Sequence, residues 1–327
     1  MYRLYPNKKQ LKMLEATLEE CRWLYNNTLA YRKEAWEERQ ERVSYYDSKA
    51  RIPILKAERP SLKNVHSQVL QNVTERVELA FQGFFRRIRE HAEEPGYPRF
   101  KGKGRYDSFT FTQSGFSITH DDRVSLSKIG AIKMVYHRKI KGTVKTCTIR
   151  HSSTGKWYVS FSVECEPERL DPINTQVGID VGLKSFATLS NEEEIPHPRF
   201  FRKEEKALAK VNRKHSKLAK GTPERRKHRK VVARVHERIK FRRENFTHQE
   251  SRQIVDRFGV ICVEDLHVNR MVHNHCLAKS IHDASWSGFF EKLFAKAEEA
   301  GRTAIKVNPA YTSQDCSRCH HRQKMPL

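Results

Sequence analysis

The stretch Val177-Gly-Ile-Asp-Val-Gly-Leu-Lys-Ser-Phe-Ala-Thr-Leu189 decides the fold of the second half of this chain. It contains a short apolar run that leads to Asp180 and a second run over Ser185–Leu189, and each has the length of a buried strand. A related stretch, Gly259-Val-Ile-Cys-Val-Glu-Asp-Leu266, places Glu264 after another apolar run. Strands that alternate with helical segments predict an α/β domain in which both acids stand at or near strand ends.

Paired carboxylates held on a scaffold are what metal-dependent phosphodiester hydrolysis needs, and oxygen ligands suit Mg²⁺. We therefore expect Asp180 and Glu264 to be catalytic residues that bind Mg²⁺. Asp180 is the better bridging ligand because Gly178 and Gly182 allow close approach of the backbone. The alternative is a strand-end carboxylate in a salt bridge, which is the more common role for a single acid taken alone.

Charge points to a nucleic-acid partner. The chain has 327 residues and a formal net charge of +24, and its length predicts two or three domains. Nineteen Lys and Arg against four Asp and Glu lie between Arg199 and Arg243. Apolar residues recur there at helical spacing, which favours two basic helices joined at Gly221-Thr-Pro223 over a disordered tail. We expect phosphate contacts from Arg225, Arg226, Lys227, Arg229 and Lys230.

The first half of the chain changes character near residue 94. Asn7 is placed to cap a helix, and a second long helix is predicted from about Ser61. Glu94-Pro-Gly-Tyr-Pro98 ends the helical region, and short alternating segments from about 95 to 167 predict an all-β barrel or sandwich. Beside this break, Arg99 and Lys101 flank an aromatic residue, which is typical of a nucleic-acid contact but also of a core aromatic.

Two further features bear on location and metal content. No run approaches the roughly 18 apolar residues of a membrane span, so we expect a soluble, cytoplasmic protein. Among the seven cysteines only Cys316 and Cys319 form a motif, Cys-x-x-Cys. This spacing supplies two of the four ligands of a structural Zn²⁺ site, and a redox dithiol is the alternative.

Taken together, these motifs resemble the TnpB proteins, which are transposon-encoded RNA-guided DNA nucleases related to type V CRISPR effectors. The matching segments are collinear from residue 3 to residue 319 and cover nearly the whole chain. They are Arg3-Leu-Tyr-Pro-Asn7, Leu70-Gln-Asn72, Gly96-Tyr-Pro-Arg-Phe-Lys101, Val177-Gly-Ile-Asp-Val-Gly-Leu-Lys184, Val263-Glu-Asp-Leu266, Ser280-Ile-His-Asp-Ala-Ser-Trp286 and Asn308-Pro-Ala-Tyr-Thr-Ser-Gln-Asp-Cys-Ser-Arg-Cys319.

The resemblance implies an RNase H-like (RuvC) α/β nuclease domain, an oligonucleotide-binding β-barrel and an inserted N-terminal helical recognition domain. The implied bounds are 1–6 and 94–170 for the barrel (wedge) domain, 7–93 for the recognition domain, 171–307 for the RuvC-like domain and 308–327 for a partial zinc knuckle. Asp180 and Glu264 correspond to the first two RuvC acids. A guide RNA would pair with double-stranded target DNA. Contacts to the adjacent motif of the target would come from Tyr45, Ser67, Gln71 and Thr112.

One segment departs from the family pattern. Family members continue to a second Cys-x-x-Cys and an Arg-Asp-x-Asn segment with a third RuvC acid, whereas this sequence reads His321-Arg-Gln-Lys-Met-Pro-Leu327. We therefore expect an incomplete Zn²⁺ site and weakened or absent cleavage in the chain as given. Three hypotheses follow: an RNA-guided DNA endonuclease, an RNA-guided protein that binds DNA without cutting it, and a transposase that joins DNA strands.

Overall fold

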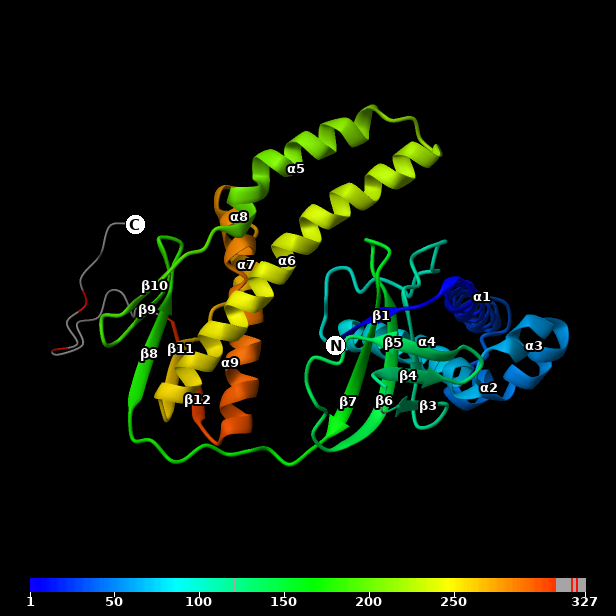
Figure 1. Ribbon diagram of the computed structural model, residues 1–327, viewed down its shortest axis with the longest axis horizontal. Helices are drawn as coiled ribbons and strands as arrows, with labels where there is room; N and C mark the ends of the chain where they lie inside the picture. Colours follow the sequence, from blue (N-terminus) through cyan, green and yellow to red (C-terminus); the bar gives the residue numbers. More distant parts are fainter. Residues whose placement is uncertain (120, 310–318, 320–321, 323–327) are drawn as a thin grey trace. The chain divides into compact units, whose positions relative to one another are not determined.

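The computed structural model describes residues 1–119, 121–309, 319 and 322, and it divides the chain into two compact units, Met1–Glu166 and Pro167–Leu327 (Figure 1). Each unit has a hydrophobic core of its own. The bounds of the elements below are those labelled in Figure 1.

The helices of the first unit come between its first two strands. Strand β1 (Tyr2–Tyr5) leads into α1 (Lys8–Arg39), whose first turn is closed by a reciprocal pair of hydrogen bonds between Asn7 and Gln10. Two short helices follow, α2 (Tyr45–Ala50) and α3 (Ile52–Glu58), and then a 3₁₀ helix, η1 (Pro60–Asn64). Helix α4 (Ser67–Arg89) begins at Ser67 rather than near Ser61, because Val65 and His66 adopt extended backbone.

The strands of the first unit form one antiparallel sheet in the order β2-β6-β7-β1-β5-β4-β3, which curls into a nearly closed barrel. Strand β1 pairs with β7 on one side and with β5 on the other, so the first residues of the chain complete a sheet whose other strands follow the helices. The remaining strands are β2 (Ser108–Phe111), β3 (Phe116–Thr119), β4 (Arg123–Leu126), β5 (Gly130–Met134), β6 (Thr143–His151) and β7 (Trp157–Glu164).

The second unit is an α/β structure around a five-stranded sheet in the order β10-β9-β8-β11-β12. Strands β8 (Gln176–Val181), β11 (Val260–Glu264) and β12 (Thr303–Val307) are parallel, while β9 (Ser185–Leu189) and β10 (Glu194–Pro196) continue the sheet antiparallel. The helices are α5 (Phe200–Lys217), α6 (Pro223–Arg257), α7 (Val268–Met271), α8 (His275–Ala284) and α9 (Trp286–Ala300).

Alternation along the central strands separates two faces of this sheet. Val177, Ile179, Ile261 and Val263 are buried in one core with residues of α6 and α9 such as Val255 and Phe289. The intervening residues of β8 and β11 therefore lie on the opposite face. Among the described residues, no helix is long and apolar enough to cross a membrane.

Candidate active site and nucleic-acid interface

The two predicted catalytic acids lie on neighbouring parallel strands. In the register of β8 with β11, Val263 stands opposite Ile179, so Glu264 and Asp180 are the next residues of their strands at the same level of the sheet. Both belong to the face opposite the buried Ile179 and Val263. Adjacent strands are about 4.8 Å apart, so the two carboxylates are cross-strand neighbours.

A pocket of about 400 Å³ opens on this face, and both acids line it. Asp180 is exposed and Glu264 is half-buried. Gly178 keeps the floor beside Asp180 free of a side chain, and its backbone is fixed by two hydrogen bonds with Ser190, at 2.9 and 3.0 Å. The other lining residues are Ile179, Thr188, Leu189, Ser190, Cys262, Val263 and Val307.

The oxygen donors of this pocket fit magnesium. Asp180 and Glu264 supply carboxylates, and Thr188 and Ser190 supply hydroxyl groups. Mg²⁺ is usually held by one or two carboxylates with waters and substrate phosphates in the remaining positions. Within residues 1–119 and 121–309, and at 319 and 322, no group of three or more His, Cys, Asp or Glu gathers to hold a metal. The pocket therefore fits a metal shared with a bound phosphate rather than one enclosed by protein ligands.

The predicted Zn²⁺ half-site falls largely outside the described residues. Cys319 is exposed, and Cys316 lies outside the part of the chain that the structure describes. The zinc assignment stays a prediction.

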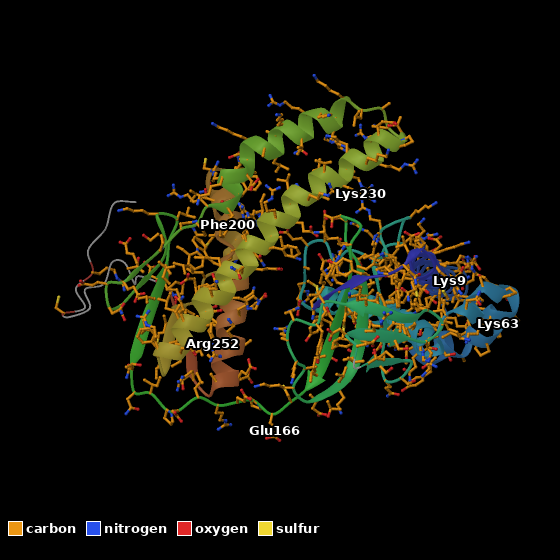
Figure 2. The ribbon with its side chains drawn as sticks, in the orientation of Figure 1. Lys9, Lys63, Glu166, Phe200, Lys230 and Arg252 are labelled. Atoms are coloured by element: carbon orange, nitrogen blue, oxygen red, sulfur yellow. The ribbon has the colours of Figure 1, made fainter. Side chains whose placement is uncertain are left out.

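The basic block folds as a helical hairpin, because Leu208 of α5 packs against Val235 and Ile239 of α6. The two helices are joined at Gly221-Thr-Pro223 as predicted, and the structure adds that Thr222 caps α6 and Pro223 begins it. Figure 2 labels Phe200 at the base of the hairpin and Lys230 in its outer half.

Not all cations of this hairpin face solvent freely. The buried Glu204 pairs with Arg238 at 3.2 Å and with Arg242 at 3.1 Å. Asp283 of α8, whose side chain is 1% exposed, pairs with Arg243 at 2.9 Å. Its carboxylate also accepts hydrogen bonds from the backbone N–H groups of residues 201 and 202 at the start of α5. Three arginines at the base of the hairpin thus link α6 to α5 through Glu204 and to α8 through Asp283.

The outer half of the hairpin keeps its charge available. Arg226, Lys227, Arg229 and Lys230 are exposed. Arg225 is half-buried, and its guanidinium donates to the carbonyl oxygen of Leu218, which ties the connecting loop to α6. Four of the five predicted phosphate contacts are therefore free to face a polyanion, and the fifth has a structural bond of its own.

The residues predicted to contact the target motif gather around α4 of the first unit. Ser67 and Gln71 are one turn apart on this helix. Gln68 accepts hydrogen bonds from the backbone of Gln113 at 3.0 Å and Ser114 at 2.8 Å, which holds the segment after Thr112 against α4. Tyr45 belongs to α2, which packs on α4, and partial burial followed by the charge of Glu75 raises the pKa of its hydroxyl.

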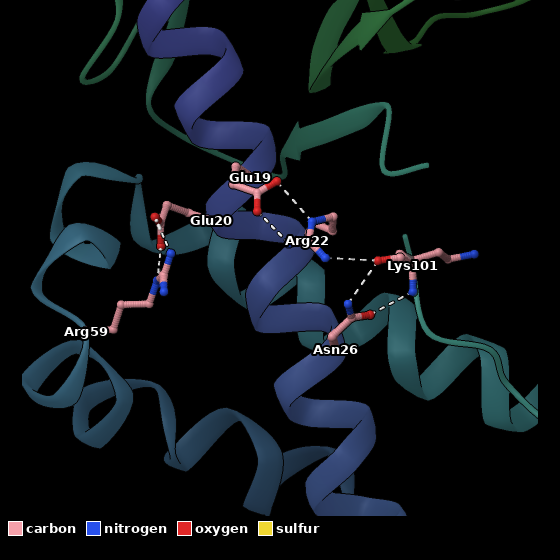
Figure 3. Close-up of polar contacts among 6 residues, drawn as sticks. All are labelled: Glu19, Glu20, Arg22, Asn26, Arg59 and Lys101. Carbon is pink, nitrogen blue, oxygen red and sulfur yellow. Dashed lines mark hydrogen bonds and ion pairs between the residues drawn. The ribbon is translucent and has the colours of Figure 1, made fainter. Parts of the chain in front are cut away.

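Arg99 and Lys101 lie in a loop of the first unit that leads to β2. Arg99 is exposed, and the main chain of Lys101 is held by side chains of α1 (Figure 3). The sequence indicated this loop by its cations, by the aromatic residue between them and by the break at Glu94-Pro-Gly-Tyr-Pro98. Asn26 and Arg22, which hold it, carry no recognisable signal because a helix surface is expected to be polar.

Three segments of the chain match known protein families. Residues 160–275 match the family described as "Probable transposase", residues 1–41 match one described as "Helix-turn-helix domain", and residues 286–325 match one described as "Cas12f1-like, TNB domain". Residues 1–41 contain β1 and the single long helix α1 in this structure, not two helices.

The chain is 32% identical over 333 residues to a "Putative RNA-guided DNA endonuclease" of Streptomyces pristinaespiralis, covering 100% of this chain and 81% of that protein. It is 28% identical over 341 residues to "Putative RNA-guided DNA endonuclease InsQ" of Escherichia coli (strain K12), covering 99% and 83% of the two chains. A solved structure, "Cryo-EM structure of the Cas12f1-sgRNA-target DNA complex", aligns with a TM-score of 0.60 at 13% identity, over 97% of this chain and 76% of that one.

The fold class is thus that of Cas12f1, with a nearly closed antiparallel barrel, a helical N-terminal region and an α/β unit that carries a pair of acids. The sequence similarity to the relative from Streptomyces pristinaespiralis spans the full length of this chain, so it identifies the family more specifically than the shared fold does. The chain belongs to the TnpB family.

Proposed function

We propose that this protein is an RNA-guided DNA endonuclease and that its second unit is an RNase H-like (RuvC) nuclease domain. The observation that carries the proposal is the placement of Asp180 and Glu264 side by side on one sheet face, in a pocket lined by oxygen donors. Family membership and the names of the relatives from Streptomyces pristinaespiralis and Escherichia coli support the reaction and the nucleic-acid partners.

The domain bounds that we propose are those that the resemblance to the TnpB family implies. We assign residues 1–6 and 94–170 to a wedge barrel, 7–93 to a recognition domain, 171–307 to the nuclease domain and 308–327 to a zinc-knuckle segment. The partners would be a guide RNA and a double-stranded DNA target, with Tyr45, Ser67, Gln71 and Thr112 near the adjacent motif. Watson–Crick pairing by the guide would read the sequence, while the protein reads the motif and the shape of the heteroduplex.

In the mechanism, Asp180 and Glu264 would hold Mg²⁺, which when bound supplies Lewis-acid polarisation of the phosphate and a water of lowered pKa. The two strands position the carboxylates before substrate arrives, because parallel pairing fixes both backbones at the same level. The hydroxyl groups of Thr188 and Ser190 can orient a phosphate or water at the rim of the pocket. The exposed cations of the hairpin would bind the backbone of the nucleic acid.

The test is cleavage of a matched duplex by the purified protein with its RNA. We expect Asp180→Asn and Glu264→Gln each to lower the rate of Mg²⁺-dependent cleavage by at least about 100-fold, as loss of transition-state charge stabilisation predicts. Asp265→Asn is the matched control, since Asp265 adjoins Glu264 but pairs with Lys306 at 3.0 Å and lines a different pocket. Cleavage unchanged in both acid variants would contradict the proposal, and strand-transfer products formed without RNA would favour a transposase.

A second candidate function is RNA-guided DNA binding without cleavage. It is favoured by the pocket's two carboxylates, since within the described part of the chain no group of three or more His, Cys, Asp or Glu is placed to hold a metal. This candidate predicts guide-dependent protection of the target in a footprinting assay that survives Asp180→Ala, together with an intact duplex when Mg²⁺ is present. Cleavage by the unsubstituted protein would exclude it.

A further inference from the structure

The segment from Pro95 to Tyr106 is a long irregular loop that side chains from elsewhere hold in place. It contains neither helix nor strand. Keeping such a segment in one conformation costs roughly 1–2 kcal/mol of backbone entropy per residue, so the contacts that order it call for an explanation.

The loop is anchored at both ends. At its start, Arg87 of α4 donates a hydrogen bond to the carbonyl oxygen of Gly96 at 2.9 Å and another to that of Pro95. The ring of Tyr97 packs edge-on against Phe81 and Phe84, with centroids 5.6 and 5.2 Å apart. At its end, the buried Tyr106 lies 6.0 Å from the ring of Tyr25 and accepts a hydrogen bond from Arg76.

The middle of the loop is anchored by α1. The amide side chain of Asn26 accepts from the backbone N–H of Lys101 at 2.7 Å and donates to its carbonyl oxygen at 2.9 Å, as a neighbouring strand would. Arg22 donates to the same carbonyl oxygen at 3.1 Å and is itself held by Glu19 (Figure 3). The backbone N–H and carbonyl groups of Lys101 are thus both hydrogen-bonded to side chains of α1.

The anchors leave a distinctive set of side chains in solvent. Phe100 is 53% exposed although it is apolar, and it adjoins the clamped Lys101. Arg99, Lys103 and Arg105 are exposed as well. The loop carries four cations in the seven residues from 99 to 105 and no acid between residues 95 and 106. An exposed aromatic ring with exposed cations on both sides of it in an anchored loop matches a base flanked by phosphates.

We propose that this loop is a preformed RNA-binding site in which Phe100 stacks on an unpaired base of the guide RNA and Arg99, Lys103 and Arg105 contact the flanking phosphates. RNA is the occupant because an exposed ring needs a base that is not already stacked in a duplex, and folded RNA presents such bases in loops and bulges. Preorganisation by Asn26 and Arg22 reduces the entropy lost on binding. The inference rests on the proposed function, since it requires an RNA partner.

The experiment measures the affinity of the full chain for three fluorescein-labelled probes: an oligouridylate, an oligodeoxythymidylate of equal length and a duplex DNA. We expect Phe100→Ala to weaken oligouridylate binding by about 5- to 150-fold with an unchanged salt slope, and Phe100→Trp to restore it. Arg99→Ala should instead lower the salt slope. Ultraviolet crosslinking with mass spectrometry should place a uridine adduct on Phe100.

Trp36→Ala is the matched control, because Trp36 is 54% exposed in the same unit but lies beside Glu37 and Glu38. It should leave RNA affinity unchanged, and thermal unfolding should verify that every variant folds. Equal binding of oligouridylate by the Phe100→Ala and unsubstituted proteins would overturn this inference alone. A Phe100 effect confined to either DNA probe would overturn the RNA assignment. Absence of RNA binding by the unsubstituted protein would overturn both the inference and the proposed function.

Discussion

Asp283 of α8 connects two helices at the base of the hairpin. Its buried carboxylate accepts from the start of α5 and pairs with Arg243 of α6. We expect Asp283→Ala to lower the free energy of unfolding of the second unit by about 3–5 kcal/mol, because it leaves Arg243 without its partner in a mostly buried position and removes a helix cap. Urea denaturation followed by circular dichroism measures the change.

The matched control is Asp256→Ala. Asp256 also pairs with an arginine of α6, Arg252, at 2.8 Å, but both side chains are over 40% exposed. An exposed pair contributes at most about 1 kcal/mol. Comparable losses in the two variants would show that the burial of Asp283 does not matter.

His66 makes the stability of the first unit depend on pH. Burial first, and then the charges of Lys128 and Lys56, lower the pKa of its imidazole from the ordinary 6.5. The unfolded chain therefore takes up this proton at a higher pH than the folded chain does. Stability is retained above pH 6.5 and falls as the pH drops through 6.5 toward the lower folded pKa. Denaturant midpoints between about pH 5 and pH 8 test this expectation.

In the same titration we expect His66→Gln to reduce the loss of stability of the first unit below pH 6.5. Burial is also the first cause that lowers the pKa values of His197 and His215, but both belong to the second unit, so the denaturation of the first unit has to be followed by its own transition. If the first unit loses the same stability below pH 6.5 in His66→Gln as in the unsubstituted protein, His66 is not the cause of the pH dependence.

At the scale of elements, the basic hairpin separates into a base held by ion pairs and a tip whose cations are exposed. We expect simultaneous substitution of Arg226, Lys227, Arg229 and Lys230 by Gln to weaken binding of all sequences about equally. The slope of log affinity against log salt should fall by about 0.7–0.9 per residue removed. Fluorescence anisotropy at several salt concentrations measures the slope.

The contrasting variant replaces Arg238 and Arg242, which pair with the buried Glu204. This change should lower the unfolding free energy and leave the salt slope nearly constant. If the base variant lowered the slope as much as the tip variant, the division of the hairpin would be wrong.

The elements that sequence could predict are those with a local signal. The cap at Asn7, the β8 and β11 strands and the basic hairpin were all visible as residue types at fixed spacing, and the structure confirms them. Strands β3 and β4 have only four residues each and were not singled out within the alternating region, and the extended break at Val65 before α4 was missed. The pairing of β8 with β11 brings together acids 84 positions apart, and only tertiary contact determines such a register. Asp283 and Asn26 were missed for the same reason, since their partners lie far away in the sequence.

At the scale of the whole molecule, the two units have separate hydrophobic cores and are joined by a segment without helix or strand between β7 and β8. We expect the chain, free of nucleic acid, to unfold in two transitions.

Phe109 and Phe289 are each fully buried, one in each core. Phe109→Leu should lower only the transition of the first unit and Phe289→Leu only that of the second, because removing aromatic volume leaves a local cavity. Differential scanning calorimetry resolves the two peaks, and near-ultraviolet circular dichroism assigns them. A single transition lowered by both substitutions would mean that the units unfold as one cooperative structure.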